Sequence, residues 1–208
     1  MSSYNRIGIL GAGRAGTAIA RAAARADVEV RIASTRSPSQ MYYHLLQYAP
    51  SATGVDAERI ADGVDFVILA VPQEDLDDVE PDWVSDQILV DATNRWDNEP
   101  LPDWFADGLE SGLSSSEVVA NHFPAARIVK ALNHISHWAM DAPRGDDARG
   151  AVVASNDKAA ADQVAEFVKD LGFDPVLAPT LASGKHTEPG TTYFNVPATS
   201  EQLARHIE

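Results

Sequence analysis

Short apolar runs separated by longer amphipathic stretches follow one another along the whole chain. The run at 65–71 is continuously apolar after its first residue, which is typical of a strand buried on both faces of a parallel sheet, and Pro72 ends it. We expect the runs to be strands at 5–10, 28–33, weakly within 53–63, and at 65–71, 87–91, 127–132, 151–154 and 175–178. Because strand and helix patterns alternate from start to finish, the sequence predicts a parallel α/β sheet.

The stretches between these runs carry helical signals. Residues 14–26 are nearly all Ala and Arg, and such small side chains let a helix lie close to the strands it covers. We expect further helix ends at Ser39 (a cap), at Ser114 with Glu117 (a capping box), at Gly172 (a C-terminal cap) and at Thr199 or Ser200 (a cap). Residues 96–112 contain Trp and Pro and are expected to be a loop, either an insertion or a lid.

The first apolar run leads directly into a glycine-rich turn. Gly11, Gly13 and Gly16 form G-x-G-x-x-G between an expected strand and an expected helix. In that context the first glycine makes the tight turn, the second leaves room for a pyrophosphate, and the third lets the helix approach the strand. The amides of Arg14 and Ala15 would then point at the phosphate from the positive end of the helix. The motif predicts a dinucleotide-binding site, and the alternative is a glycine-rich turn without a ligand.

The end of the second expected strand carries Ser34, Thr35 and Arg36. A protein that binds NAD usually has Asp or Glu here, which accepts a hydrogen bond from the 2′-hydroxyl of the adenine ribose. A guanidinium can instead hold a 2′-phosphate bidentately, and the two hydroxyls can donate to it. The segment therefore predicts NADP as the cofactor, unless Arg36 is only a solvated surface charge.

The nicotinamide should lie where three expected strands end, because ligands cross the carboxyl ends of the strands in a doubly wound sheet. The apolar edge of Val71 and Pro72 can pack on the ring, and the amides of Asn94 and Asn133 suit its carboxamide or a substrate. The predicted contacts at this end are Ala70, Val71, Pro72, Asn94, Ala131 and Asn133. No acid–base pair stands out, so the catalytic residues stay unknown.

These observations together predict one domain over residues 1–208, with no linker that would divide it. The expected fold class is α/β, a doubly wound and mostly parallel sheet (a Rossmann fold) with a C-terminal strand-helix-strand extension in the same domain. Residues 1–135 would form the dinucleotide-binding core. Residues 136–208 would form the extension and shape a second pocket.

Composition narrows the class of partner. The chain has 31 Asp and Glu against 16 Lys and Arg, a net charge of −15, which repels nucleic acid and anionic membranes. It has no Cys, which excludes disulfide and thiol chemistry. No apolar run approaches the roughly 18 residues that a membrane span needs, and we expect a cytoplasmic protein. The acidic run from Asp75 to Asp82 is interpreted as a solvated face.

Several other residues have both a functional and a structural interpretation. His134 and His137 form H-x-x-H without a fitting carboxylate, so packing or a role in a second pocket is favoured over a metal site. Trp96 and Trp104 could cover a planar ring or simply anchor a core. The loop at 185–187 could bind an anionic group or form an ordinary surface turn.

Read in order, the motifs of this chain resemble one known family, the NADP oxidoreductases that use the deazaflavin coenzyme F-420. The matching segments are Gly-Ala-Gly-Arg-Ala-Gly at 11–16, Ser-Thr-Arg at 34–36, Leu-Ala-Val-Pro at 69–72, Val-Asp-Ala-Thr-Asn at 90–94, Val-Lys-Ala-Leu-Asn at 129–133, Leu-Gly-Phe-Asp-Pro-Val at 171–176 and Glu-Pro-Gly at 188–190. The resemblance implies hydride transfer between NADPH and a second small-molecule redox cofactor, such as F-420 or a flavin. It also implies a homodimer.

Two alternatives stay open at this point. The chain could be a non-catalytic NADP(H)-binding sensor or regulatory protein whose second pocket is closed. It also shares the pattern of its first half with pyrroline-carboxylate-type reductases, but those need a long helical domain after the sixth strand. Here a strand-helix-strand pattern follows instead, so this alternative ranks last.

Overall fold

The computed structural model describes residues 4–96, 99–141 and 149–207, which form an eight-stranded sheet. Its order is β3-β2-β1-β4-β5-β6-β7-β8. The strands are β1 (Arg6–Leu10), β2 (Glu29–Ala33), β3 (Ala52–Gly54), β4 (Phe66–Leu69), β5 (Ile88–Asp91), β6 (Arg127–Ala131), β7 (Gly150–Ala154) and β8 (Asp174–Ala178). The first six strands are parallel, whereas β7 is antiparallel to β6 and parallel to β8. The predicted fold class, a mostly parallel Rossmann-type sheet, is confirmed.

The described residues also form seven α-helices and four short 3-10 helices. The α-helices are α1 (Arg14–Arg25), α2 (Pro38–Tyr48), α3 (Asp103–Glu110), α4 (Ser115–His122), α5 (His137–Asp141), α6 (Lys158–Asp170) and α7 (Ser200–Ile207). The 3-10 helices are η1 (Ala57–Arg59), η2 (Gln73–Asp78), η3 (Pro81–Val84) and η4 (Leu181–Thr187). The predicted strand-helix-strand extension is β7-α6-β8.

Two local expectations were wrong. Helix α2 is capped by Ser37 rather than Ser39, because Pro38 suits the first helical position and the Ser37 amide donates to Gln40 Oε1 at 3.0 Å. The expected loop at 96–112 contains helix α3, whose buried Phe105 packs in the core below the sheet.

The other expected helix ends are supported by the observed contacts. The Ser114 amide donates to Glu117 Oε2 at 2.9 Å, which is half of the predicted capping box. Gly172 follows α6 with a φ of +98°, a left-handed conformation that glycine adopts without strain. The amide of Gln202 donates to the Thr199 hydroxyl at 3.2 Å, so Thr199 caps α7.

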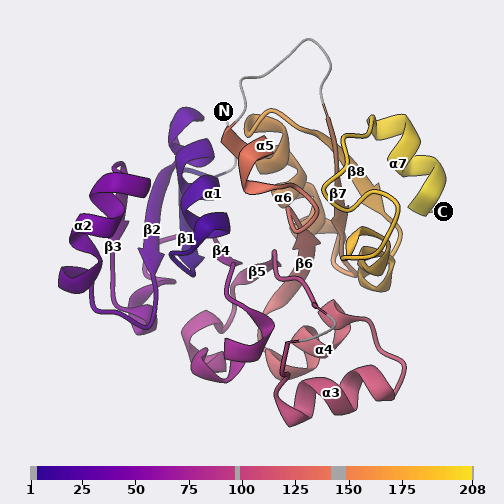
Figure 1. Ribbon diagram of the computed structural model, residues 1–208, viewed down its shortest axis with the longest axis horizontal. Coiled ribbons are helices and arrows are strands. Elements are labelled where there is room, and N and C mark those ends of the chain that lie inside the picture. Colours follow the sequence, from indigo (N-terminus) through magenta and orange to yellow (C-terminus); the bar gives the residue numbers. More distant parts are fainter. Residues whose placement is uncertain (1–3, 97–98, 142–148, 208) are drawn as a thin grey trace.

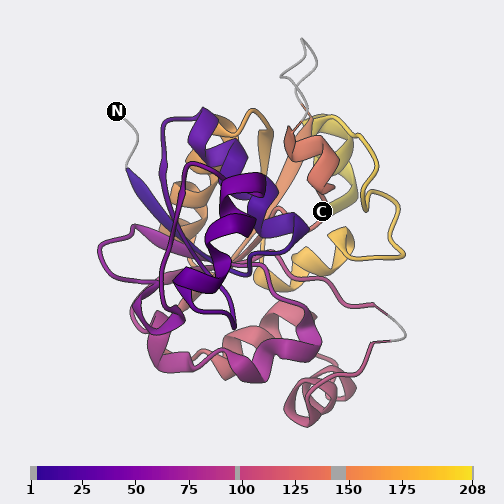
Figure 2. The ribbon, with the colours of Figure 1, turned by 60° about the vertical axis from the view of Figure 1, so that its left-hand side comes forward.

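The helices cover both faces of the sheet, as the ribbon views show (Figures 1 and 2). Helices α1, α2 and α6 lie on one face, where their apolar side chains form a core cluster with β1, β2 and β4. The 3-10 segments η2 and η3, together with α3 and α4, enclose a second cluster on the opposite face. Every residue of β4 is buried, which agrees with its apolar sequence.

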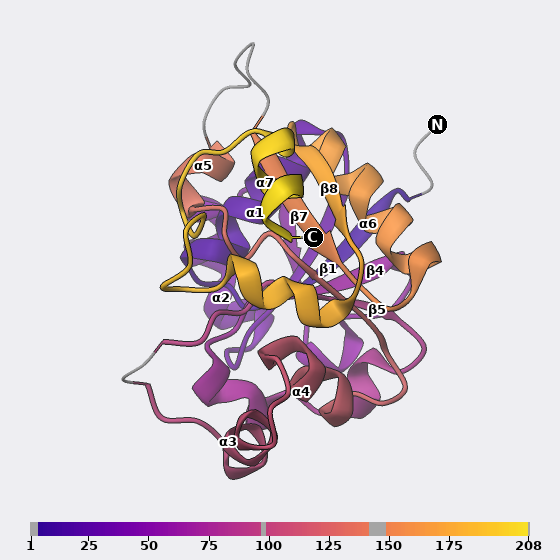
Figure 3. The ribbon, with the colours of Figure 1, turned by 90° about the vertical axis from the view of Figure 1, so that its right-hand side faces the viewer.

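The C-terminal extension shares the first of these cores. Phe167 of α6 is fully buried, and its ring meets Phe66 of β4 edge-on at 5.1 Å and Tyr4 at 5.6 Å between centroids. Helix α7 packs against β7 and β8 on the other side (Figure 3). No helix among the described residues is both long and apolar enough to cross a membrane.

Because Phe167 joins the extension to the dinucleotide-binding half, its truncation should weaken the whole protein. We expect Phe167→Ala to lower the free energy of unfolding by about 3–5 kcal/mol, through lost burial and a cavity between the rings. Urea unfolding followed by circular dichroism and by Trp fluorescence should still give one transition. Leu177→Ala, at a half-exposed position on β8, is the control and should cost far less. Two separate transitions would show that residues 136–208 fold as a second unit.

Candidate functional site

The glycine-rich turn brings three backbone segments into direct contact at the end of β1. Gly11 has a φ of +114°, and a Cβ there would overlap the carbonyl oxygen of Ala70, just beyond β4. A Cβ on Gly16 would overlap the carbonyl oxygen of Gly11. Gly13 differs, because a Cβ on it would meet nothing within 4 Å. Packing therefore requires glycine at positions 11 and 16. Gly13 borders open space at the start of α1, and this space suits a pyrophosphate.

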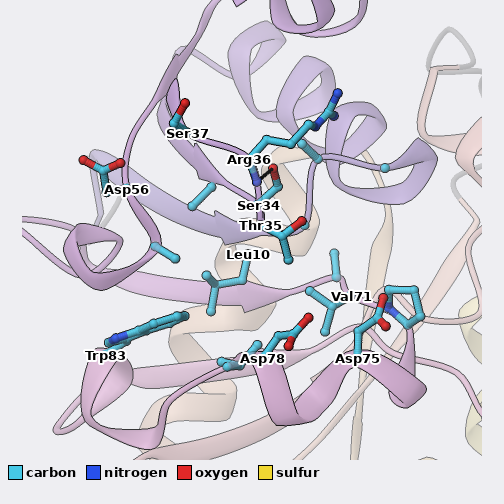
Figure 4. Close-up of a pocket in the computed structure, with 18 of the residues that line it drawn as sticks. Leu10, Ser34, Thr35, Arg36, Ser37, Asp56, Val71, Asp75, Asp78 and Trp83 are labelled. Carbon is cyan, nitrogen blue, oxygen red and sulfur yellow. Dashed lines mark hydrogen bonds between the residues drawn. The ribbon is translucent and has the colours of Figure 1, made fainter. Parts of the chain in front are cut away.

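A cavity of about 750 Å³ opens beside this turn. Its lining includes eight of the predicted cofactor contacts, namely Gly11, Gly13, Ser34, Thr35, Arg36, Ala70, Val71 and Pro72. Figure 4 shows the segment that follows β2 on one wall and η2 and η3 on the opposite wall. Three more of the predicted residues, Arg14, Ala15 and Gly16, form the first turn of α1 next to the cavity.

The segment after β2 presents the polar groups predicted from the sequence. The Arg36 amide donates to Ser34 Oγ at 3.1 Å, which folds the segment into a tight turn. The guanidinium of Arg36 is exposed, and in Figure 4 it points away from Asp75 and Asp78. It forms no ion pair or hydrogen bond with any residue in the described ranges. An unpaired guanidinium beside two hydroxyls is suited to bind an anion.

His44 is a pocket residue that sequence reasoning missed. It lies on α2, and its Nε2 is 2.7 Å from the carbonyl oxygen of Ala12 in the glycine-rich turn. In the tautomer that carries the proton on Nε2, the ring donates to this oxygen and ties α2 to the turn. Because the turn and the histidine are far apart in sequence, no local pattern could have indicated the contact.

The acidic residues of the run after β4 are exposed, which agrees with the interpretation as a solvated face, and two of them also border the cavity. Residues 73–78 form η2, and in a 3-10 helix residues three apart lie on the same side. Asp75 and Asp78 therefore point together into the cavity, as Figure 4 shows. Asp56 and Glu58, around η1, also line it, and so does Trp83 of η3. The wall opposite the Ser34–Arg36 segment therefore carries Asp75 and Asp78, whose place in the cavity the sequence interpretation did not predict.

The amides predicted at the ends of β5 and β6 bind each other. Asn94 Nδ2 donates to the carbonyl oxygen of Asn133 at 2.8 Å, and Asn133 Nδ2 donates to Asn94 Oδ1 at 3.1 Å. Asn133 is buried and also bonds Thr187 of η4, donating to its carbonyl oxygen at 2.9 Å and accepting from its hydroxyl at 3.1 Å. Asn133 therefore holds Asn94 and η4 together, and Ala131 lies fully buried beneath them.

A buried ion pair lies under the same strand ends. Lys130 Nζ is 3.2 Å from Asp91 Oδ2 and donates to the Thr93 carbonyl oxygen at 2.8 Å, and both charged side chains are at most 1% exposed. Asp91 also accepts from the Ser116 hydroxyl at 2.6 Å and from the Thr93 amide at 2.9 Å. Glu188 Oε1, just after η4, is 3.6 Å from Lys130 Nζ. This network connects β5, β6, α4 and the C-terminal segment.

His134, Trp96 and Trp104, for which the sequence left both a functional and a packing role open, all have partners within the protein. Burial, with a smaller contribution from the Lys130 ammonium, lowers the pKa of His134 to about 4, so the ring is neutral near pH 7. Trp104 donates to Asp77 Oδ1 at 2.7 Å and stacks on His122. Trp96 meets Phe194 edge-on at 5.5 Å between centroids. Across the described residues, no three His, Asp or Glu side chains gather as a metal site would require.

The fold and this cavity define the class of protein as one with a Rossmann-type sheet and a cavity suited to a dinucleotide. The model of the family described as NADP oxidoreductase, coenzyme F-420-dependent, matches residues 6–95. Over these residues the chain is similar to that family, whose description names NADP and coenzyme F-420. The matched segment contains the glycine-rich turn, the Ser-Thr-Arg segment and the acidic wall.

Two curated proteins are similar to about half of this chain. The chain is 33% identical over 107 residues to metalloreductase STEAP3 of Rattus norvegicus, covering 51% of this chain and 20% of that protein. It is 33% identical over 102 residues to metalloreductase STEAP2 of Mus musculus, covering 49% and 19%. The chain thus spans about a fifth of the length of these relatives.

Two solved structures resemble nearly the whole chain. A hypothetical protein of Sinorhizobium meliloti superposes with a TM-score of 0.76 at 29% identity, covering 96% of both chains. An Arthrobacter protein, provisionally described as an F-420-dependent NADP-reductase, has a TM-score of 0.70 at 24% identity and covers 88% of both chains. The second likeness supports the fold alone.

The buried ion pair gives a stability prediction. We expect Lys130→Ala to lower the free energy of unfolding by about 3–5 kcal/mol, because Asp91 is left buried without its counter-charge. The double variant Asp91→Ala/Lys130→Ala should lose less than the sum of the single variants. Urea unfolding measures both. Lys158→Ala, which breaks an exposed pair with Asp162, is the control and should cost at most about 0.5 kcal/mol. A similarly small loss for Lys130→Ala would contradict the assigned role of the pair.

Proposed function

We propose that the protein binds NADPH across the cavity and transfers its hydride to a second, ring-shaped redox cofactor. The observation that carries the proposal is the unpaired guanidinium of Arg36 beside the hydroxyls of Ser34 and Thr35. These groups occupy the position where a protein that binds NAD has a carboxylate. A carboxylate would repel a 2′-phosphate, whereas this trio can accommodate its two negative charges.

The cofactor's pyrophosphate would lie over the glycine-rich turn. Gly13 leaves this side open, Arg14 and Ala15 at the start of α1 are exposed residues, and their amides would donate to the pyrophosphate. The partial positive charge of the helix N-terminus favours an anion there. This attraction acts against the overall charge of −15, so binding depends on local donors rather than on long-range attraction.

The nicotinamide would reach the ends of β4 and β5. When bound, NADPH supplies a hydride to the acceptor, which takes up that hydride and a proton from solvent while NADPH becomes NADP. Ala70, Val71 and Pro72 provide an apolar edge against one face of the ring and keep water from it. Asn94 is half-buried and held in place by its two bonds to Asn133, and the remaining N–H of its side chain would meet the carboxamide. The protein's contribution is then orientation of two rings rather than acid–base chemistry.

A deazaflavin such as F-420, or a flavin, is the proposed acceptor. The family description supports a deazaflavin, and the C-terminal segment supports an acceptor site formed by residues 136–208. In that segment Thr187 binds Asn133, and Phe194 contacts Trp96 beside the end of β5. The extension would therefore form the outer wall of the second pocket, next to the nicotinamide.

The 2′-phosphate assignment gives a discriminating test. Wild type should bind NADPH at least tenfold more tightly than NADH. We expect Arg36→Ala to weaken NADPH binding by about 2–3 kcal/mol, roughly 30- to 150-fold, because a charged partner of the 2′-phosphate is lost. NADH binding should hardly change. Coenzyme fluorescence titrations measure all four affinities. Arg205→Ala, at an exposed position on α7, controls for the lost charge. Equal losses for NADPH and NADH would show that Arg36 does not read the phosphate.

The acceptor is tested by turnover. Purified protein should oxidise NADPH when F-420, FMN or FAD is added. The loss of the near-ultraviolet absorbance of NADPH measures the reaction. A reaction without protein measures the uncatalysed oxidation of NADPH. A reaction with Arg36→Ala at sub-saturating NADPH measures the rate when binding of the coenzyme is weakened. Tight, selective binding of NADPH without turnover for any of the three acceptors would contradict the catalytic proposal and favour an NADP-binding sensor.

A further inference from the structure

The two walls of the cavity have opposite charge. Arg36 and the hydroxyls of Ser34 and Thr35 lie on one wall. The opposite wall carries the carboxylates of Asp75 and Asp78, whereas Asp56 lies on the same side as Ser37 (Figure 4). Neither the Asp75 nor the Asp78 side chain has a hydrogen bond or ion pair with a residue in the described part of the chain. Their charge is therefore available to whatever group faces them.

The phosphates of a bound dinucleotide cannot be that group. Like charges brought together in a partly enclosed cavity repel each other, so the pyrophosphate and the 2′-phosphate belong on the other side, at the glycine-rich turn and at Arg36. The acidic wall needs a neutral group that carries N–H donors. The adenine base meets this need, because it is attached to the same ribose as the 2′-phosphate and carries an exocyclic amino group.

The shape of this part of the cavity also suits a flat base. Leu10 at the end of β1, Val79 after η2 and the ring of Trp83 on η3 all line it. In Figure 4 the carboxylate of Asp78 points in between Leu10 and Val71, whereas Asp75 lies farther along, beside Val71 and away from Trp83. Apolar side chains would contact the faces of the base, and a carboxylate would meet its edge.

We propose that Asp78 reads the exocyclic amino group of the adenine base and makes the site selective for adenine. This inference rests on the proposed NADPH binding and adds the determinant of base specificity. A carboxylate only accepts hydrogen bonds, so it pairs with the amino group of adenine. It repels the carbonyl oxygen that hypoxanthine has at the same position. Such a mismatch leaves an acceptor facing an acceptor, and it discriminates more than the loss of a contact would.

The experiment compares NADPH, NADH and the reduced hypoxanthine analogue of NADPH on the same proteins by fluorescence titration. Wild type should bind the analogue about tenfold more weakly than NADPH. In Asp78→Asn the ratio between the two should fall to about twofold or less, because the side-chain amide can turn its N–H toward a carbonyl oxygen. The preference for NADPH over NADH should be kept in this variant. Circular dichroism verifies that the variant is folded.

Two matched variants complete the test. Asp82→Asn removes an exposed carboxylate on η3 that does not line the cavity, and Asp75→Asn removes the other carboxylate of η2. Both should keep the tenfold ratio. The inference is overturned if wild type binds NADPH and the analogue within twofold of each other, or if either variant lowers the ratio as much as Asp78→Asn. Loss of the preference for NADPH over NADH in wild type would instead overturn the proposed function.

Discussion

The close approach of three backbone segments at the end of β1 is the constraint on which the rest of the structure depends. Gly11 contacts the carbonyl oxygen of Ala70, and Gly16 contacts that of Gly11, at distances that a side chain would prevent. These contacts bring the start of α1 against the ends of β1 and β4. The first turn of α1 then faces outward, with open space beside Gly13. A cavity for a dinucleotide follows from this arrangement.

The far side of the site depends on a different kind of interaction. A fully buried Lys130–Asp91 pair, with hydrogen bonds from Ser116 and Thr93, joins the ends of β5 and β6 to α4. Such pairs add little net stability compared with apolar packing, but they tolerate few alternative arrangements once they are buried. Together with the Asn94–Asn133 bonds, the pair fixes where the C-terminal segment meets the sheet. These contacts would therefore determine the shape of the proposed second pocket.

The positive charge of Arg36 and the negative charges of Asp75 and Asp78 lie on opposite walls of the cavity and form no ion pair with each other. The cationic and hydroxyl groups follow β2, and the carboxylates of Asp75 and Asp78 follow β4 on the opposite wall. For an anionic ligand this arrangement sets orientation, because each wall accepts only one part of the molecule. The same separation explains how a chain with a net charge of −15 can offer an anion site at all. Local donors within a few ångströms outweigh distant charges that salt screens.

The sequence by itself determined the fold class, the glycine-rich turn and the position of Ser34, Thr35 and Arg36, because these follow from local patterns of apolar residues and from steric limits on a single turn. Only the tertiary structure decided which side chains share the cavity. His44 reaches Ala12, and Asp75 and Asp78 lie opposite the Ser34–Arg36 segment, only when α2 and η2 pack beside the turn. It also decided that Asn133 is buried, because Thr187 lies 54 residues further along the chain. Contacts between distant segments depend on how the layers pack, and a local pattern does not contain that information.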